Sequence, residues 1–320
     1  MYEVFYYIVD MSFELTILGS SSATPTANRN PTGQILNFRD KLYLIDCGEG
    51  TQSRIRQNRI KFNQIEKIFI SHLHGDHYFG LLGLLSTYNL MGREKPVDLY
   101  GPPALKQVID LHMKITHSAW RYPLNFHPTN PLEQECIYDD NKIAIYSFPL
   151  IHRVDTTGFK FVEKQKSRPI NRKMIDDYEI PYYAINLIKE GADYELDDGT
   201  VLANHKLTFD PPKPRSYAFC SDTVYTETIL PYIQGVDLLY HEATFLHELK
   251  DQARQTKHTT ARQAAEIATK AQVGKLLIGH FSSRYKKLKP LLVEAQEYFE
   301  NTELALEGKK FEIEAHENNQ

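Results

Sequence analysis

One stretch of seven residues, Ser71-His72-Leu73-His74-Gly75-Asp76-His77, constrains this chain more than any other part of it. It brings together three imidazoles and one carboxylate, which are side chains that bind metals or move protons. The apolar run at residues 65–70 predicts a buried strand before it, and the apolar run at residues 78–85 predicts a helix after it. The stretch is therefore expected at a strand-to-helix turn.

The spacing of the polar residues in this stretch indicates two neighbouring points of convergence. His72 and His74 are two positions apart, so they point the same way if the extended geometry continues through them. Asp76 and His77 follow the turn and are expected to face a second point close by. A polar loop with scattered histidines is the plain alternative, and the apolar runs on both sides argue against it. A helical His-Glu-x-x-His zinc site is absent from the sequence.

The pattern His-x-His-x-Asp-His after a strand resembles the metallo-β-lactamase superfamily of dinuclear metal hydrolases. Two divalent metals need roughly six to eight ligands, so other parts of the chain must supply some of them. Residues that follow other predicted strands are the candidates. Five imidazoles and two carboxylates suit zinc, and manganese would also suit the carboxylates. The expected ligands are His72, His74, Asp76, His77, His152, Asp222 and His280.

The order of predicted elements indicates an α/β protein with polar residues at strand ends, where such proteins build their sites. Strands are predicted at residues 13–18, 34–38, 42–45, 65–70, 97–100, 143–148, 216–220, 238–240, 275–278 and 310–315. Helices are predicted at residues 78–85, 104–115, 261–271 and 291–298, with Thr259 or Thr260 as the N-cap of the third.

Asp46 ends one of the predicted buried strands, where a carboxylate needs partners. Two roles stay open for it. It could accept the free ring N–H of a metal-bound histidine, or it could cap a helix that begins near Gly48.

Composition bears on the cellular compartment of the protein and on its relation to a membrane. The chain has 320 residues, of which 42% are hydrophobic, and no apolar run approaches the roughly 20 residues that cross a bilayer, so no membrane contact is expected. Its three cysteines are widely spaced and form no Cys-x-x-Cys pair, which favours the cytoplasm. Residues 1–10 lack the features of a signal peptide, and Met11 could start translation. We therefore expect an N-terminal extension over 1–10 and one domain over 11–320.

One segment stands out by its charge. The formal net charge of −4 gives no overall attraction to nucleic acid, so any such contact must be local. Between residues 160 and 173 the sequence has six basic residues and one acid, Glu163. Residues 153–200 are therefore expected to form an inserted arm that meets a polyanion, although an ordinary solvated surface segment explains this composition equally well.

Further motifs narrow the resemblance. They are Asp46-Cys47-Gly48-Glu49-Gly50-Thr51-Gln52, Cys220-Ser221-Asp222-Thr223, His241-Glu242-Ala243-Thr244-Phe245, His258-Thr259-Thr260-Ala261 and His280-Phe281-Ser282-Ser283-Arg284-Tyr285. Between about residues 13 and 288 the chain is similar to the ribonuclease Z family of tRNA 3′-processing endonucleases. That resemblance implies a four-layer αβ/βα sandwich of the metallo-β-lactamase type, two zinc ions per chain, a homodimer and an arm that grips tRNA.

The resemblance also implies a role for each candidate residue. His72, His74 and His152 would hold one metal, Asp76, His77 and His280 the other, and Asp222 would bridge them. Asp76 would accept a proton from the attacking water. His258, oriented by Glu242, would sit by the leaving oxygen and protonate it, as a histidine can at neutral pH. The expected substrate contacts are Lys213, Arg215, Arg284, Lys164, Lys166 and Arg168, where Lys213-Pro214-Arg215 is a compressed form of a basic loop in the family.

The resulting hypothesis is a zinc-dependent endoribonuclease that removes the 3′ trailer of precursor tRNA and leaves a 3′-hydroxyl. One alternative is a phosphodiesterase of the same fold that acts on small or cyclic phosphodiesters. Another is a catalytically silent RNA-binding scaffold, which the complete set of expected ligands disfavours.

Overall fold

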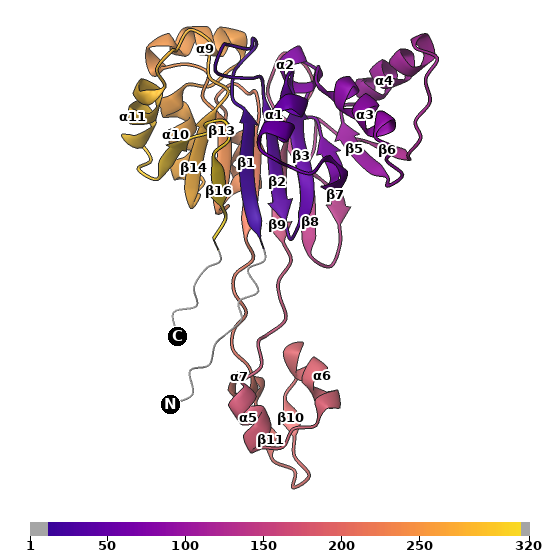
Figure 1. Ribbon diagram of the computed structural model, residues 1–320. Helices are drawn as coiled ribbons and strands as arrows, with labels where there is room; N and C mark the ends of the chain where they lie inside the picture. Colours follow the sequence, from indigo (N-terminus) through magenta and orange to yellow (C-terminus); the bar gives the residue numbers. More distant parts are fainter. Residues whose placement is uncertain (1–11, 315–320) are drawn as a thin grey trace. The chain divides into compact units, whose positions relative to one another are not determined.

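Two seven-stranded β-sheets form the body of the computed structural model, which describes residues 12–314 (Figure 1). The first sheet has the order β16-β1-β2-β3-β4-β5-β6 and the second β15-β14-β13-β12-β9-β8-β7. The strands of the first sheet are β1 (Phe13–Gly19), β2 (Gly33–Phe38), β3 (Lys41–Cys47), β4 (Ile65–Phe69), β5 (Val97–Gly101), β6 (Leu124–Pro128) and β16 (Lys310–Glu312). Those of the second are β7 (Glu135–Asp139), β8 (Ile143–Leu150), β9 (Thr156–Glu163), β12 (Ser216–Cys220), β13 (Leu238–Glu242), β14 (Lys275–Gly279) and β15 (Thr302–Leu304).

The inner faces of the two sheets meet through aromatic rings. The ring of Tyr43 on β3 stacks on Phe161 of β9 with centroids 6.2 Å apart, and Phe69 of β4 lies 5.4 Å from Phe159 of β9. All four side chains are fully buried. Large rings of this kind bury much apolar area and therefore hold the sheets together.

Helices cover the outer face of each sheet because the strands are apolar on both sides. On the first sheet, Leu44 and Ile68 belong to one buried cluster with residues of α1 (Thr51–Gln57), α3 (Leu81–Leu90) and α4 (Pro103–Ile115). On the second, Leu239 and Leu276 cluster with residues of α8 (Leu230–Ile233), α10 (Ala261–Lys270) and α11 (Lys289–Gln296). The order of layers is helix, sheet, sheet, helix, which confirms the predicted four-layer sandwich.

Strand direction sets where a site can form. β3, β4, β5 and β6 are parallel neighbours, and so are β12, β13, β14 and β15. Their carboxyl ends therefore form continuous edges, from which the following loops and two further helices, α2 (Gly75–Tyr78) and α9 (Lys250–Thr256), begin.

In the two large sheets the structure adds strands that were not predicted from the sequence, namely β6, β7, β9 and β15. The most consequential is β9, which pairs inside the second sheet although its residues fall within the segment 153–200 that was expected to be an arm. A second compact unit consists mainly of Val162–Arg215. It contains α5 (Arg172–Asp177), α6 (Ile185–Lys189), α7 (Asn204–Leu207), β10 (Tyr194–Glu195) and β11 (Val201–Leu202) around a small core of its own. The expected extension over 1–10 lies outside the described residues.

Within residues 12–314, no helix combines the length and the apolar character that a bilayer crossing requires.

The N-cap of α10 provides a test of local stability. Thr260 Oγ1 accepts a hydrogen bond from Gln263 N, and Gln263 Oε1 accepts one from Thr260 N, which together form a capping box. Thr260→Ala should lower the free energy of unfolding by about 1 kcal/mol, measured by urea denaturation, because it leaves a helix N–H without its acceptor. Thr260→Ser keeps the hydroxyl, so it should recover most of that loss. An equal loss in both variants would show that the methyl group, and not the cap, matters.

Candidate active site

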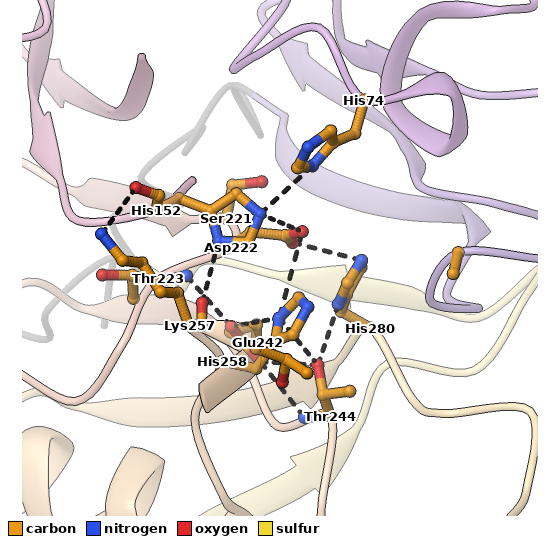
Figure 2. A network of polar contacts seen from close by, with 12 residues as sticks. His74, His152, Ser221, Asp222, Thr223, Glu242, Thr244, Lys257, His258 and His280 are labelled. Carbon is orange, nitrogen blue, oxygen red and sulfur yellow. Dashed lines mark hydrogen bonds and ion pairs between the residues drawn. The ribbon is translucent and has the colours of Figure 1, made fainter. Parts of the chain in front are cut away.

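All seven expected metal ligands gather at the carboxyl ends of the strands. His72, His74, Asp76 and His77 follow β4, His152 follows β8, Asp222 follows β12 and His280 follows β14. Their ligand atoms form two groups, each with members within 4.8 Å of one another: His72, His74, His152 and Asp222 in the first, and Asp76, His77 and His280 in the second. In Figure 2 dashed lines join His74 to His152, and join the carboxylate of Asp222 to both His152 and His280.

In the first group, three ring nitrogens point at one another. His74 Nδ1 lies 3.1 Å from His72 Nε2 and 3.1 Å from His152 Nε2. Asp222 Oδ2 lies 3.6 Å from Nε2 of both His72 and His152. Four donor atoms therefore surround one point.

The second group is built in the same way. His280 Nε2 lies 3.3 Å from both Asp76 Oδ2 and His77 Nε2. Asp222 Oδ1 lies 3.1 Å from His280 Nε2 and 3.5 Å from His77 Nε2, and it makes no hydrogen bond. The two oxygens of Asp222 thus face one group each, as a bridging carboxylate would.

Hydrogen bonds on the far side of each ring decide which nitrogen faces the centre. The Nδ1–H of His77 donates to Asp46 Oδ2 at 2.7 Å, and that of His152 donates to the Lys257 carbonyl at 2.8 Å. His72 Nδ1 lies 3.0 Å from Ser71 Oγ, whose own proton goes to Asp46. In all three rings Nδ1 has its partner on the far side, so Nε2 is the nitrogen that faces the centre, as in metal-bound histidines.

This arrangement fits a pair of cations. Inward-facing lone pairs at 3.1–3.3 Å repel one another unless a positive charge lies among them. Burial lowers the pKa of His77, but the carboxylates of Asp222, Asp76 and Asp46 outweigh it and raise that pKa well above the usual value. The cluster of carboxylates therefore favours positive charge at this place, which divalent cations would supply.

Asp46 has the first of the two roles that the sequence left open. It contacts His77 and also accepts hydrogen bonds from Ser71 N at 2.7 Å and Ser71 Oγ at 2.9 Å. The helix after it, α1, has Gly50 as its N-cap and no capping side chain. The carboxylate thus orients the loop of ligands.

His258 lies beside the two groups, outside both sets of expected ligands. Its Nδ1–H donates to Glu242 Oε1 at 2.9 Å, and Nδ1 lies 4.0 Å from Asp222 Oδ2 (Figure 2). Burial lowers the pKa of His258, but Glu242 and Asp222 outweigh it and raise the pKa to about 9. The ring is therefore protonated at neutral pH and keeps Nε2–H for another acceptor.

The carboxylate of Glu242 is fully buried, and neighbouring backbone and hydroxyl groups donate hydrogen bonds to both of its oxygens. Oε1 accepts from Thr223 N at 3.0 Å, and Oε2 accepts from Thr244 Oγ1 at 2.6 Å and Thr244 N at 3.2 Å. Thr223 and Thr244 were not singled out in the sequence, because an ordinary hydroxyl after a strand carries no distinctive signal. Ser71 was missed as a hydrogen-bonding residue for the same reason.

The expected substrate contacts differ in their surroundings. Arg284 is exposed near Phe245, whose ring lies 4.9 Å from its guanidinium. Arg215 is buried, and its guanidinium bonds to Glu163 with Nε 2.9 Å from Oε2, so it stabilises the end of β9 and does not face solvent. Lys213 is exposed, and Lys164, Lys166 and Arg168 belong to the second compact unit.

The ligands open into a cavity of about 580 Å³. His74, Asp76, His152, Asp222, His258 and His280 line it, together with Phe79, Arg153 and Phe245. A phosphodiester with parts of its neighbouring nucleosides is of this size.

Comparison with known proteins identifies the family. The chain is 48% identical over 303 residues to a protein from Phocaeicola vulgatus named Ribonuclease Z, a match that covers 95% of this chain and 98% of the relative. The chain belongs to the ribonuclease Z family. Among solved structures, human tRNase Z, short form, is 26% identical with a TM-score of 0.70, and covers 94% of this chain and 99% of its own.

Two other comparisons concern the fold. The metallo-β-lactamase fold protein YhfI from Bacillus subtilis superposes with a TM-score of 0.68 at 17% identity, over 94% of this chain and 99% of that one, which confirms the predicted fold type of this ribonuclease Z family member. A family model described as Anti-Pycsar protein Apyc1 matches residues 13–164. That match is less than half of the chain and ends before Asp222, Glu242, His258 and His280.

His74 tests the first group of ligands. His74→Ala removes the nitrogen that lies 3.1 Å from two other ring nitrogens, so metal content, measured by elemental analysis after dialysis, should fall together with activity. His205→Ala, which removes an exposed histidine of α7, is the matched control and should keep its metal. Full activity with unchanged metal content in His74→Ala would contradict the assignment.

Proposed function

We propose that this protein is an endoribonuclease that removes the 3′ trailer from precursor tRNA and leaves a 3′-hydroxyl on the tRNA. The observation that carries the proposal is the complete set of seven ligands beside the His258–Glu242 pair, in a chain that matches a ribonuclease Z over nearly its whole length.

The ligands suit phosphodiester hydrolysis. His72, His74 and His152 would hold one cation, Asp76, His77 and His280 the other, and Asp222 would contact both. The chemistry that such a pair supplies when bound is a lowered pKa of water and neutralisation of phosphate charge.

The chain's own groups would move the protons. Water attacks phosphorus, and the bond from phosphorus to the ribose 3′-oxygen breaks. Burial raises the pKa of Asp76, but His77 and His280 outweigh it and hold the pKa below its ordinary range, so the carboxylate is ionised. An ionised carboxylate can accept a hydrogen bond from the attacking water, and we propose that it takes the proton as the new bond to phosphorus makes that proton acidic. His258 donates its Nε2 proton to the departing oxygen, and Glu242 holds the ring in place through Nδ1.

The alternative function, hydrolysis of small or cyclic phosphodiesters, is not favoured. The relative that matches 95% of the chain is named Ribonuclease Z. A silent RNA-binding scaffold has no need of seven converging ligands and a buried carboxylate–histidine pair.

We further infer that the cations are two zinc ions per chain, although manganese would also suit the carboxylates. The preponderance of imidazole among the ligands supports zinc.

Free Cys47, Cys136 and Cys220 support a place in the reducing cytoplasm. We also infer a homodimer, for which the exposed apolar side chains of Leu111 and Ile115 on α4 offer a contact surface. Elemental analysis tests for zinc, and analytical ultracentrifugation tests for the homodimer.

Only a short segment of the second compact unit has the positive charge that a contact with the tRNA backbone requires. Basic residues lie at its start, where Lys166 Nζ is 3.8 Å from Glu163 and Arg168 Nη2 is 2.6 Å from Asp210. Residues 176–198 carry eight acids and one lysine, Lys189, so phosphate groups would be repelled there. We therefore propose that Lys164, Lys166 and Arg168 contact RNA and that the acidic segment does not.

The direct test of function is incubation of the metal-loaded protein with a precursor tRNA, followed by mapping of both ends. We expect one cut on the 3′ side of the tRNA, with a 3′-hydroxyl on the tRNA and a 5′-phosphate on the trailer. A 5′-hydroxyl on the trailer would rule out the proposed direction of cleavage.

His258 tests the proton donor. His258→Ala should keep its metal and its affinity for tRNA while kcat falls about 10²–10⁴-fold, because the ribose oxygen then departs unprotonated. A substrate with sulfur in place of that oxygen needs little protonation and should rescue the variant. If the variant is as defective on the sulfur substrate as on the normal one, His258 is not the acid.

The basic segment tests the RNA contact. Changing Lys164, Lys166 and Arg168 together to glutamine should raise KM for precursor tRNA and weaken its dependence on salt, with little change in kcat. The matched control in the same unit changes exposed Asp177 and Glu190 to their amides and should not raise KM. An unchanged KM in the triple variant at every salt concentration would exclude the contact.

A further inference from the structure

A second cavity, of about 480 Å³, lies next to the active site. Lys250, Asp251 and Arg254 of α9 line it, with Tyr225 after β12 and Gln263 of α10. His258 lines both this cavity and the one that contains the expected metal ligands. The histidine is therefore the side chain that the two spaces share.

The new cavity differs from the first in its charge. Lys250 and Arg254 are four positions apart on α9, so they lie on one side of the helix, and both are exposed. Within residues 12–314, neither side chain takes part in an ion pair or a hydrogen bond, and Asp251 is the one acid in the cavity wall. The cavity with the metal ligands has Glu49, Asp76 and Asp222 in its wall. Two exposed cations without partners and a single acid in one cavity wall indicate a place for an anion.

The position of His258 indicates which anion. In the proposed reaction His258 protonates the 3′-oxygen of the last tRNA nucleotide, so the ribose of that nucleotide must lie against the ring. The backbone then continues from this ribose to the phosphate on its 5′ side, one step further from the scissile bond. His258 also lines the cavity of Lys250 and Arg254, so that cavity lies within reach of this neighbouring phosphate.

We propose that Lys250 and Arg254 bind the phosphate on the 5′ side of the last tRNA nucleotide, next to the phosphodiester that is cut. This inference rests on the proposed function. The contact would hold the tRNA strand on one side of the scissile bond while the metal ligands hold the other, and so would help to set the nucleotide after which the cut is made. The contact would not distinguish one base from another, because the phosphate is the same in every nucleotide.

The first test removes the two charges. Changing Lys250 and Arg254 together to alanine should lower kcat/KM for precursor tRNA about tenfold and reduce the slope of its logarithm against the logarithm of salt concentration by about 1, the value for one phosphate. The control, Lys61→Ala with Lys95→Ala, removes two exposed lysines that line neither cavity and has the same net charge. Equal losses in the two double variants would overturn the inference.

The decisive test changes the substrate. A precursor tRNA with a neutral methylphosphonate in place of the phosphate on the 5′ side of the last tRNA nucleotide should be cut about tenfold less efficiently by the natural protein. The double variant should suffer no further loss on this substrate, because the contact is already missing. Independent losses would refute the contact. So would a coupling that occurs only when the methylphosphonate is placed in the trailer, since the cavity would then hold the other strand segment.

The proposed function and the phosphate contact can be tested apart from each other. If the natural protein does not cut unmodified precursor tRNA, the proposed function is wrong. If it cuts the unmodified substrate normally but the methylphosphonate and the double variant act independently, only the phosphate contact is wrong. Unchanged metal content and melting temperature in the double variant show that a loss of kcat/KM does not arise from misfolding.

Discussion

The buried carboxylate of Asp46 holds the active site together. It accepts hydrogen bonds from both the amide and the hydroxyl of Ser71 and from His77, and a carboxylate without water needs all of these partners. Ser71 Oγ is also 3.1 Å from Ser221 Oγ, next to the bridging Asp222. A single carboxylate at the end of β3 thus connects the loop after β4 in the first sheet with the loop after β12 in the second. Both groups of metal ligands depend on this connection, because each takes residues from both loops or faces Asp222.

The arrangement of strands explains why the ligands converge from distant parts of the sequence. Parallel neighbours end at the same edge, so a residue just after each strand lies beside its counterparts. The aromatic core between the sheets brings the two edges together. Close contact of backbones completes the geometry: the amide of Gly80 donates to the carbonyl of Cys47, and a Cβ on Gly80 would lie 2.2 Å from the carbonyl oxygen of Gly48. The turn between α2, which carries His77, and α3 is thereby held against the end of β3. There Asp46 accepts a hydrogen bond from the His77 ring.

Sequence reasoning predicted the strands with continuous apolar runs and the ligands that follow them, because burial on both faces leaves a strong pattern. It missed β9, in which Thr156, Thr157 and Gly158 precede the two phenylalanines and basic residues follow closely, so the charge of the following segment obscured a buried strand. It also treated Arg215 as an RNA contact by its place in a basic loop. Composition cannot reveal that Glu163, the one acid among six basic residues, is buried beside it and neutralises it. Pairing across some fifty residues is a property of the tertiary structure.

Glu242 shows how one buried acid can serve two functions at once. Oε1 accepts a hydrogen bond from the Nδ1–H of His258, which orients the ring and leaves Nε2 available to another group. Oε2 accepts the proton of Thr244 Oγ1, so that hydroxyl can only accept from His280 Nδ1, which lies 3.0 Å away. Nδ1 of His280 is thereby engaged by Thr244, and Nε2 is the nitrogen that faces Asp76 and Asp222. The same carboxylate therefore orients the proposed proton donor and one of the proposed metal ligands. Because Oε1 holds His258 directly and Oε2 holds His280 through Thr244, the two rings are parts of one hydrogen-bonded unit.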